Sequence, residues 1–429
     1  MLRISSLISN FRRLRLPLIL ATITALLVAA CNPANFQTQA AQVPTLIATL
    51  LGDPSTFNSA LNESFYSTYI LGLVYDSMIS LNPLTKELEP ALAESWKISE
   101  DGLRINITLK EGLKWSDGKP MTADDIVFSY NSIYLNPKIP TPTKDSLKIN
   151  ERGDTPKVRK IDERTVEFSI PEPFAPFLLW VGGIPILPKH ALEESIRTLG
   201  PNGSPQFLRK WGLNTNPKEI IGNGPYIIES YVPSQRVILE RNPHYWRKDD
   251  GGNTQPYIER IIYSVIESTD NMLISFRSGQ LDTLEVPPEG FRLLKREEKR
   301  GKFTIYNGGS DTSTTFISFN LNKAKNSKGQ PFVNPTKSRW FNKKEFRQAV
   351  AYAIDRETMK TNSFRGLGQL QNSFVYVDSP FFLPPEKGLK VYDYNPDKAK
   401  KLLLQAGFKY NAQNQLVDND GNIVRFTLL

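Results

Sequence analysis

The residue types that most often carry out catalysis are scarce in this chain. It contains two histidines, His190 and His244, and a single cysteine, Cys31. A serine or cysteine nucleophile needs a neighbouring base, and a zinc site needs several nitrogen or sulfur ligands. His190 lies at a predicted helix start and His244 lies in a predicted turn among aromatic residues, so neither belongs to such a motif. The sequence therefore predicts no catalytic residue, no bound metal and no cofactor.

Two short segments resemble ligand-binding loops without matching them. Asp418-Asn419-Asp420-Gly421 is similar to the start of a calcium loop, but its glycine comes two positions early and no glutamate follows at the twelfth position. Gly222-Asn223-Gly224-Pro225 lacks the third glycine of a dinucleotide-binding loop. The first segment is interpreted as a hairpin turn, and we assign no nucleotide site to the second.

Cys31 can do a different chemistry, because its thiol can accept a lipid. Four arginines occur within residues 1–15, and the uncharged apolar stretch 16–30 is shorter than the ~20 residues of a membrane-spanning helix. This pattern predicts a signal peptide. The stretch ends in Leu-Val-Ala-Ala-Cys, which resembles the lipobox of bacterial lipoproteins, so Cys31 is the predicted lipidation site. The polar residues 32–43 are interpreted as a tether.

The charge of the chain argues against a nucleic-acid partner. The net charge of +9 includes the four arginines of the first thirty residues, which contain no acid, so the remainder carries +5. The most basic run, residues 295–300 (KREEKR), alternates with glutamates. This run predicts a solvent-exposed helix face, and we assign it no function from the sequence.

The elements that must position any binding residues mix strands with helices. Alternating or short apolar runs predict strands at 45–51, 104–109, 165–170, 237–240, 261–266, 303–306 and 423–429. Helices are predicted to begin after Thr122, with Asp125 completing a capping box, to span 270–277, to begin after Asn342, and to begin at Asn395-Pro396 and end at Gly407. A chain of 429 residues exceeds the size of a single core, so the predicted class is α/β or α+β in several lobes.

Several separated blocks of sequence resemble one family. They include Leu88 to Trp96 (LEPALAESW), Leu109 to Gly118 (LKEGLKWSDG), Gly222 to Tyr226 (GNGPY), Glu240 to Trp246 (ERNPHYW) and Phe346 to Arg356 (FRQAVAYAIDR). Their order and spacing resemble family 5 of the bacterial extracellular solute-binding proteins, which includes the oligopeptide-, dipeptide- and nickel-binding lipoproteins of ABC importers. Further blocks follow the same order, namely Thr122 to Ser129, Ser278 to Asp282, Phe319-Asn320 and Lys398 to Phe408.

The resemblance implies a fold and a domain arrangement. The expected architecture is the type II periplasmic-binding-protein fold, with two lobes joined by a hinge and one inserted domain. Residues 44–64 and 174–270 would form the hinge-proximal lobe, 65–173 the inserted domain, and 271–429 the distal lobe. Residues 1–30 would be the signal peptide and 31–43 the lipid-anchored linker. Members of the family continue on the order of a hundred residues further, so we expect the distal lobe to be incomplete and the chain to be a truncated member.

The resemblance also implies a function. The chain is expected to capture short peptides in a cleft between the lobes and to deliver them to a membrane permease and its ATPase, without catalysis. The expected location is the periplasmic side of the cell envelope, with acylated Cys31 in the membrane lipid. The candidate ligand-binding residues are loop residues predicted to face the cleft, Asp53, Pro54, Ser55, Thr56, Ser310, Asp311, Thr312 and Ser313.

Two alternatives stay open at this point. The same fold could bind another solute, such as a nickel chelate, a sugar or an opine, because the fold does not fix the ligand. A third function, from a different class, is that of an envelope lipoprotein that holds unfolded chains as a chaperone. Aggregation assays without a stoichiometric ligand would separate the chaperone from either solute receptor.

Overall fold

The structure, a computed structural model, describes residues 44–82, 85, 87–309, 314–377, 379 and 381–428. The chain divides into two compact units, Met1–Leu284 and Glu285–Leu429. Among the described residues, no helix is both long and apolar enough to cross a membrane. The finer division into a hinge-proximal lobe, an inserted domain and a distal lobe stays a prediction.

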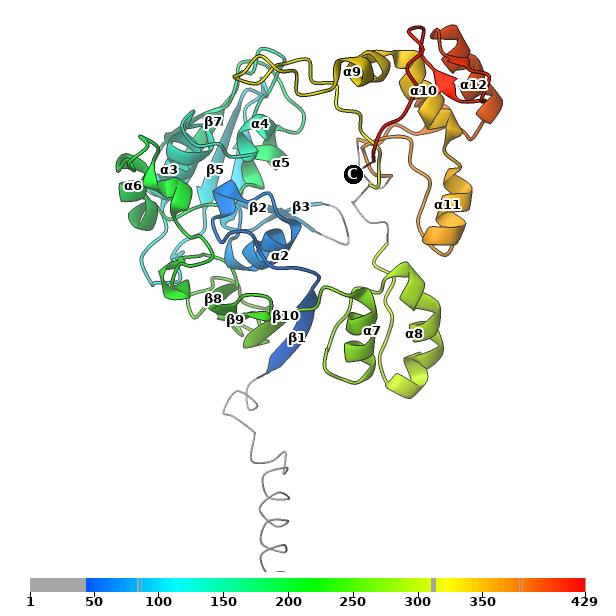
Figure 1. The fold of residues 1–429 in the computed structure, drawn as a ribbon. Coiled ribbons are helices and arrows are strands. Elements are labelled where there is room, and N and C mark those ends of the chain that lie inside the picture. Colours follow the sequence, from blue (N-terminus) through cyan, green and yellow to red (C-terminus); the bar gives the residue numbers. More distant parts are fainter. Residues whose placement is uncertain are drawn as a thin grey trace, which may run out of the picture. The chain divides into compact units, whose positions relative to one another are not determined.

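The first unit contains a four-stranded sheet that begins with the first predicted strand. In spatial order its strands are β1 (Thr45–Leu50), β10 (Arg260–Val265), β9 (Arg236–Arg241) and β8 (Tyr226–Val232) (Figure 1). β1 pairs with β10 in parallel, and the other neighbours are antiparallel. The outer edge of β1 is contacted by Asp282, whose carboxylate accepts the Ile47 N–H at 2.7 Å and whose own N–H bonds to the Ile47 carbonyl at 2.8 Å.

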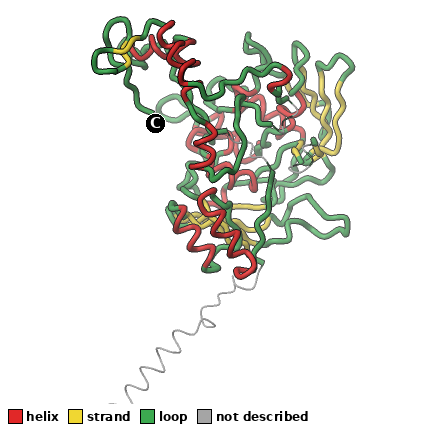
Figure 2. The backbone as a smooth tube through the Cα atoms, turned by 90° about the vertical axis from the view of Figure 1, so that its right-hand side faces the viewer, coloured by secondary structure: helices red, strands yellow, loops and turns green. Residues whose placement is uncertain are grey.

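A second, antiparallel sheet lies apart from the first in the same unit. Its strands, in order, are β4 (Ala93–Ile98), β5 (Arg104–Leu109), β7 (Thr165–Ser169) and β6 (Lys157–Lys160). Figure 2 shows the strands of the two sheets as separate yellow groups. On β5 the alternating residues Ile105, Ile107 and Leu109 are buried, which confirms the predicted strand. A two-stranded sheet joins β2 (Ile79–Leu81) to β3 (Leu88–Pro90).

The helices of the first unit surround these sheets. They are η3 (Ser59–Leu61), α2 (Phe65–Val74), α3 (Ala123–Phe128), the π-helix η4 (Ser129–Tyr134), α4 (Thr143–Ser146), α5 (Phe177–Gly182), α6 (Lys189–Arg197), η5 (Gln206–Arg209), η6 (Pro217–Glu219) and α7 (Thr269–Arg277). α3 begins as predicted, with a capping box between Thr122 and Asp125. Buried residues of both sheets and of most helices form one continuous hydrophobic core.

The second unit is mainly helical. Its elements are α8 (Pro288–Gly301), α9 (Pro335–Asn342), α10 (Lys344–Ala353), α11 (Arg356–Ser363), η7 (Pro385–Lys387), α12 (Pro396–Gln405), β11 (Lys409–Tyr410) and β12 (Leu416–Val417). α10 packs against α12. The core gathers five phenylalanines, which are Phe319, Phe341, Phe346, Phe408 and Phe426. α12 confirms the prediction, because Asn395 accepts the Lys398 N–H and Gly407 has a positive φ of 87°.

Two strand predictions are wrong. Residues 303–306 form no strand, because the end of α8 occupies their donors: the Ile305 N–H bonds to the Glu298 carboxylate at 2.8 Å and the Phe303 N–H to the Glu298 carbonyl at 3.3 Å. Of the predicted strand 423–429, Ile423 makes a single bridge to Val417 and the described residues 424–428 are not in a strand. A strand needs a run of paired residues. In the described structure the second segment pairs only briefly, through the Ile423 bridge and the bond from the Val424 N–H to the Leu416 carbonyl at 2.8 Å.

The predicted cap at Asn342 is also wrong. Asn342 is the last residue of α9, and its side-chain amide donates to the Ser338 carbonyl one turn earlier at 2.9 Å. α10 begins at Lys344, after Lys343 in an extended conformation. Asn342 therefore ends one helix, where the pattern predicted that it begins the next. An asparagine side chain can donate to a preceding carbonyl as well as accept from a following N–H.

Candidate functional site

The loop after β1 contains the first group of predicted ligand residues, and α2 positions its backbone. The Ser55 N–H bonds to the Ser67 hydroxyl at 2.9 Å, and the Thr56 N–H contacts the same hydroxyl at 3.3 Å. Ser67 is fully buried on α2. One buried hydroxyl thus accepts from two consecutive donors of the loop, which holds the loop in a fixed turn against the helix.

Asp53 is engaged by the turn between β8 and β9. Its carboxylate accepts from the Tyr231 hydroxyl at 3.0 Å, from the Ser234 N–H at 3.0 Å and from the Ser234 hydroxyl at 3.1 Å. Burial, together with this bond and the negative charge of Asp53, raises the pKa of Tyr231 to about 12. Both carboxylate oxygens are therefore occupied by structural contacts that fasten the loop to the sheet. The ligand-binding role of Asp53 stays a prediction.

The other three residues of this group differ in accessibility. Pro54 is buried, Ser55 is exposed, and Thr56 is half-buried. The Thr56 hydroxyl accepts the Asn58 N–H at 3.0 Å and contacts the Trp211 carbonyl at 3.5 Å. Of the four predicted residues in this loop, Ser55 therefore offers the most accessible side chain to a ligand.

An exposed aromatic cluster lies beside this loop. We define the α2 aromatic cluster as Phe65, Tyr66 and Tyr69; Phe65 makes edge contacts with both tyrosines, at ring-centre distances of 6.0 and 5.0 Å. Phe65 is 65% exposed and Tyr69 39%. Tyr66 lies on Gly52, where a Cβ atom would come within 2.7 Å of its ring. These residues were not among the predicted ligand residues, although aromatic side chains at i and i+4 after the N-cap Ser64 were a usable signal.

The remaining predicted residues are outside the described part of the chain. Ser310, Asp311, Thr312 and Ser313 fall in one such gap, and Cys31 in another. Their roles stay predictions, as does the cleft between the lobes.

The two histidines converge on one turn of the first unit. His190 Nε2 lies 2.9 Å from Asp117 Oδ2, and a Cβ at Gly118 would lie 3.2 Å from His244 Nε2. Partial burial acts to raise the pKa of Asp117, but bonds from the Lys119 N–H and from His190 outweigh it and hold that pKa below its usual value. The described ranges contain no group of three or more His, Cys, Asp or Glu residues placed to hold a metal.

A partly buried polar network joins the motif blocks to the core. Asp76 accepts the Trp246 indole N–H at 3.0 Å, and its backbone N–H bonds to the Asn223 side chain at 2.8 Å. Lys110 lies over the Trp246 ring, 4.4 Å from its centre. Burial raises the pKa of Asp76 despite these contacts. Gly224 lies so close to the end of α2 that a Cβ would come within 2.7 Å of the Leu73 carbonyl oxygen, which explains the glycine in the GNGPY block.

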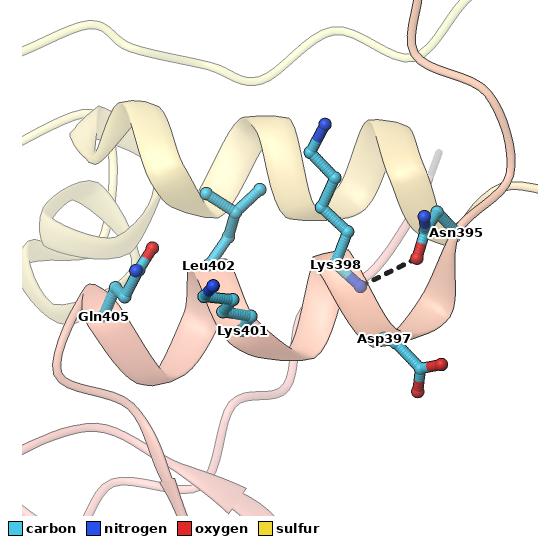
Figure 3. A pocket seen from close by; sticks show the side chains of 6 residues that line it. All are labelled: Asn395, Asp397, Lys398, Lys401, Leu402 and Gln405. Carbon is cyan, nitrogen blue, oxygen red and sulfur yellow. Dashed lines mark hydrogen bonds between the residues drawn. The ribbon is translucent and has the colours of Figure 1, made fainter.

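In the second unit, a shallow surface depression runs along α12. It is lined by Asn395, Asp397, Lys398, Lys401, Leu402 and Gln405, all from one helix and its cap (Figure 3). The close view shows Asn395 bonded to the Lys398 backbone, as its capping role requires. Because one helix supplies every lining residue, the depression encloses no ligand, and we assign it no binding function.

Comparisons with known proteins identify the family. The family model for bacterial extracellular solute-binding proteins, family 5, matches residues 87–428. A probable ABC transporter-binding protein of Deinococcus radiodurans is 31% identical over 82% of this chain and 58% of its own length. The oligopeptide-binding protein AppA of Bacillus subtilis is 27% identical over 95% of this chain and 68% of its own. A periplasmic alpha-galactoside-binding protein of Rhizobium meliloti is 28% identical over 78% of this chain and 47% of its own.

A solved structure supports the same assignment. The structure of Bacillus subtilis AppA in complex with a nonapeptide aligns with a TM-score of 0.65 and 25% identity, over 88% of this chain and 67% of that one. The fold is therefore the mixed α/β fold of these type II binding proteins, as predicted. The chain spans roughly half to two thirds of the length of the relatives it matches. The chain belongs to family 5 of the bacterial extracellular solute-binding proteins.

Proposed function

We propose that this chain captures short peptides and delivers them to the permease and ATPase of an ABC importer. The observation that supports this most is the likeness to AppA, which extends over 95% of the chain in sequence and includes a solved complex with a nonapeptide. The relatives are longer than this chain, so the function is proposed for the protein to which these residues belong.

The geometry of the loop after β1 fits a receptor that accepts many peptides. Such a receptor gains affinity from the shared backbone and must tolerate varied side chains. Asp53 and Thr56 are engaged by the protein itself, whereas Ser55 and the ring of Phe65 are exposed and could contact a ligand. Ring faces and edges contact most side chains without selecting one. This surface would bind by contact area more than by charge.

A second candidate ligand is a sugar. Exposed aromatic rings such as Phe65 and Tyr69 also provide flat apolar surfaces for sugar rings, and the Rhizobium relative is named for alpha-galactosides. Only the shared fold supports a nickel chelate or an opine as the ligand. A chaperone would bind unfolded chains and have no defined solute. These alternatives differ in the solute that stabilises the protein.

Thermal unfolding in the presence of candidate solutes separates them. A ligand at 100 times its Kd stabilises the folded state by about 2.7 kcal/mol, which raises the melting temperature by several degrees. We expect a pool of peptides to produce this shift, and an alpha-galactoside or nickel with free histidine to produce none. A shift with the sugar or the chelate but not with peptides would contradict the proposal. A matched pair of variants, F65A and F316A, each removes one exposed phenylalanine, and only F65A should weaken the shift.

We propose no catalytic step for this chain. The family is one of solute-binding proteins, and both histidine rings contact the turn around Asp117. A mass measurement of recovered peptide after prolonged incubation tests this, because hydrolysis would release fragments. We expect the peptide to be recovered intact.

We also propose that Cys31 is acylated and that the mature protein works on the periplasmic side of the envelope as a lipoprotein. The support is the sequence pattern of residues 1–31 together with membership of an extracellular family. Two or three acyl chains would retain the protein at the membrane, since a single chain gives marginal binding. Mass spectrometry of the N-terminal peptide should find a lipid on Cys31. The variant C31A should lose it, and an unmodified, uncleaved N-terminus in the wild type would contradict the proposal.

A further inference from the structure

The basic run at 295–300 looks balanced in sequence, but α8 separates its charges. Arg292, Lys295, Arg296 and Lys299 follow the i, i+3, i+4, i+7 spacing that places side chains on one helix face, and all four are exposed. Leu294, on the opposite side, is fully buried. The helix therefore presents a basic stripe to solvent.

The neighbouring glutamates lie at the boundary of the buried side. The side chains of Glu297 and Glu298 are 16% and 21% exposed, whereas those of Arg300 and Lys295 are 80% and 53% exposed. Glu298 also accepts the Ile305 N–H at 2.8 Å. Glu298 pairs with Lys295 and Glu297 pairs with Arg300, at the edges of the basic stripe. No acid lies at the centre of the stripe on this helix face.

Three bases at the centre of this stripe pair with no acid in the part of the chain that the structure describes. Among the described residues, no ion pair is found for Arg292, Arg296 or Lys299, and Lys302 extends the exposed basic surface beyond the helix end. We define the α8 basic face as Arg292, Lys295, Arg296, Lys299, Arg300 and Lys302. A dense group of unpaired like charges on one face is unfavourable by itself, and an anionic partner would relieve the repulsion.

The charge of the whole second unit has the same sign. Residues 285–429 contain 24 Lys and Arg against 14 Asp and Glu, a net charge of +10, whereas residues 44–284 contain 25 against 30, a net charge of −5. Anionic phospholipid surfaces attract such basic helical faces over about a Debye length, roughly 8–10 Å at moderate salt. The tether 32–43 reaches at most about 40 Å when extended, so an anchor at Cys31 keeps the folded part close to a membrane.

We propose that the α8 basic face binds the anionic headgroups of the membrane to which the chain is attached. This inference rests on the proposed attachment through the N-terminal segment, and it is independent of the ligand. Binding at several phosphates would restrict the second unit to the membrane surface, where the permease of an importer is also located. High salt should release it, since the contact is electrostatic.

Lysine acetylation, measured by mass spectrometry on the full chain incorporated into vesicles, tests the proposal. Lys295, Lys299 and Lys302 report on the α8 basic face, and the exposed lysines Lys323, Lys325 and Lys328 are an internal control in the same unit. We expect acetylation of the first three to be slowed roughly threefold or more in vesicles with 30% phosphatidylglycerol relative to phosphatidylcholine alone, with the control lysines unchanged. Raising the salt to about 0.5 M should remove the difference.

Two triple variants with the same change of charge sharpen the result. R292Q/R296Q/K299Q should abolish the protection of Lys295 and Lys302, whereas K323Q/K325Q/K328Q should leave it intact. Equal protection of both lysine groups, equal loss in both variants, or no difference between the two lipids would overturn the proposal. Protection that rises with protein density on phosphatidylcholine would instead assign the face to a second copy of the chain. Flotation of the vesicles measures separately whether the chain is attached. It therefore distinguishes a chain that fails to attach from an attached chain whose α8 does not contact the lipid.

Discussion

The two units of this protein bury their apolar residues in different ways. The first unit places two four-stranded sheets and most of its helices around one continuous core, in which Trp115, Trp211 and Phe168 are fully buried. The second unit has smaller clusters between helices, and it exposes large side chains such as Phe332 (60%) and Phe374 (75%). The two units also differ in how they satisfy their backbone hydrogen bonds.

Helices satisfy their own backbone bonds, whereas strands depend on a partner. In the first unit every predicted strand pairs with another strand. The partner can lie far away in sequence, as β10 does for β1. In the second unit the predicted helices formed at 344–353 and 396–405, but the predicted strands at 303–306 and 423–429 did not. The second unit is therefore held mainly by side-chain packing between helices, whereas the first also depends on backbone pairing between strands.

The comparison is tested most strongly by removing one phenylalanine from each core. Phe168 is fully buried in the first unit and Phe346 is 2% exposed in the second. F168A and F346A should each lower the free energy of unfolding of their own unit by about 3–5 kcal/mol, from lost contacts and a cavity. Scanning calorimetry should show two transitions, each shifted by one variant. A single transition moved equally by both variants would show that the cores are not separate.

Close backbone packing in the first unit predicts the next largest effect. G224A places a methyl group against the Leu73 carbonyl, and such overpacking should cost about 1–3 kcal/mol of unfolding free energy. The control is G72A, on an open face of α2 with nothing within 4 Å, which should raise stability by about 0.5–1 kcal/mol. Urea unfolding measures the free energy of unfolding of both variants, which should change in opposite directions. Similar effects of both substitutions would contradict the described packing.

A smaller effect is expected at the loop after β1. D53A removes the acceptor of the Tyr231 hydroxyl and the Ser234 N–H, and should lower stability by about 1–2 kcal/mol. S55A changes an exposed hydroxyl and should stay within about 0.5 kcal/mol of the wild type. The two predicted ligand residues have separate roles if S55A lowers the affinity for peptide and D53A lowers the stability of the fold. An unchanged melting temperature for D53A would refute the structural role.

The smallest effects concern two carboxylates whose pKa values move in opposite directions. Burial raises the pKa of Asp76 in the first unit, so ionisation costs stability as pH rises through that pKa. Partial burial also acts on Asp418 in the second unit, but bonds from Trp340 and Asn422 outweigh it and lower the pKa, so ionised Asp418 adds stability that is lost as pH falls.

Relative to the wild type, D76N should therefore gain stability between pH 3 and pH 7, and D418N should lose it. Urea unfolding of the three proteins at both pH values measures the differences. Parallel pH dependence in the two variants would contradict the opposite pKa directions.

Sequence reasoning succeeded where the determining residues are neighbours. Thr122 and Asp125 form a capping box within one turn, and Asn395 and Gly407 define both ends of α12. The alternation at 104–109 likewise depends on local periodicity. Each of these signals is complete within a few residues, so it can be read without knowing the fold.

The candidate site was harder to predict because its contacts join distant segments. Asp53 bonds to Tyr231 and Ser234, nearly 180 positions away, and no local pattern reveals that its carboxylate is already engaged. Trp211 is fully buried and has a left-handed φ of 58°, which is rare for a large side chain and which no local pattern reveals. The basic face of α8 becomes visible only once the helix is known, because acids and bases alternate in the run KREEKR.

The central proposal is that the protein to which these residues belong is a receptor for short peptides. Native mass spectrometry of the protein, purified gently from the bacterium that produces it, tests that claim most directly. We expect one ligand per chain, with a spread of masses that fragment as short peptides of mixed sequence. A single bound sugar or metal chelate, or a protein that stays empty after incubation with a broad peptide pool, would contradict it.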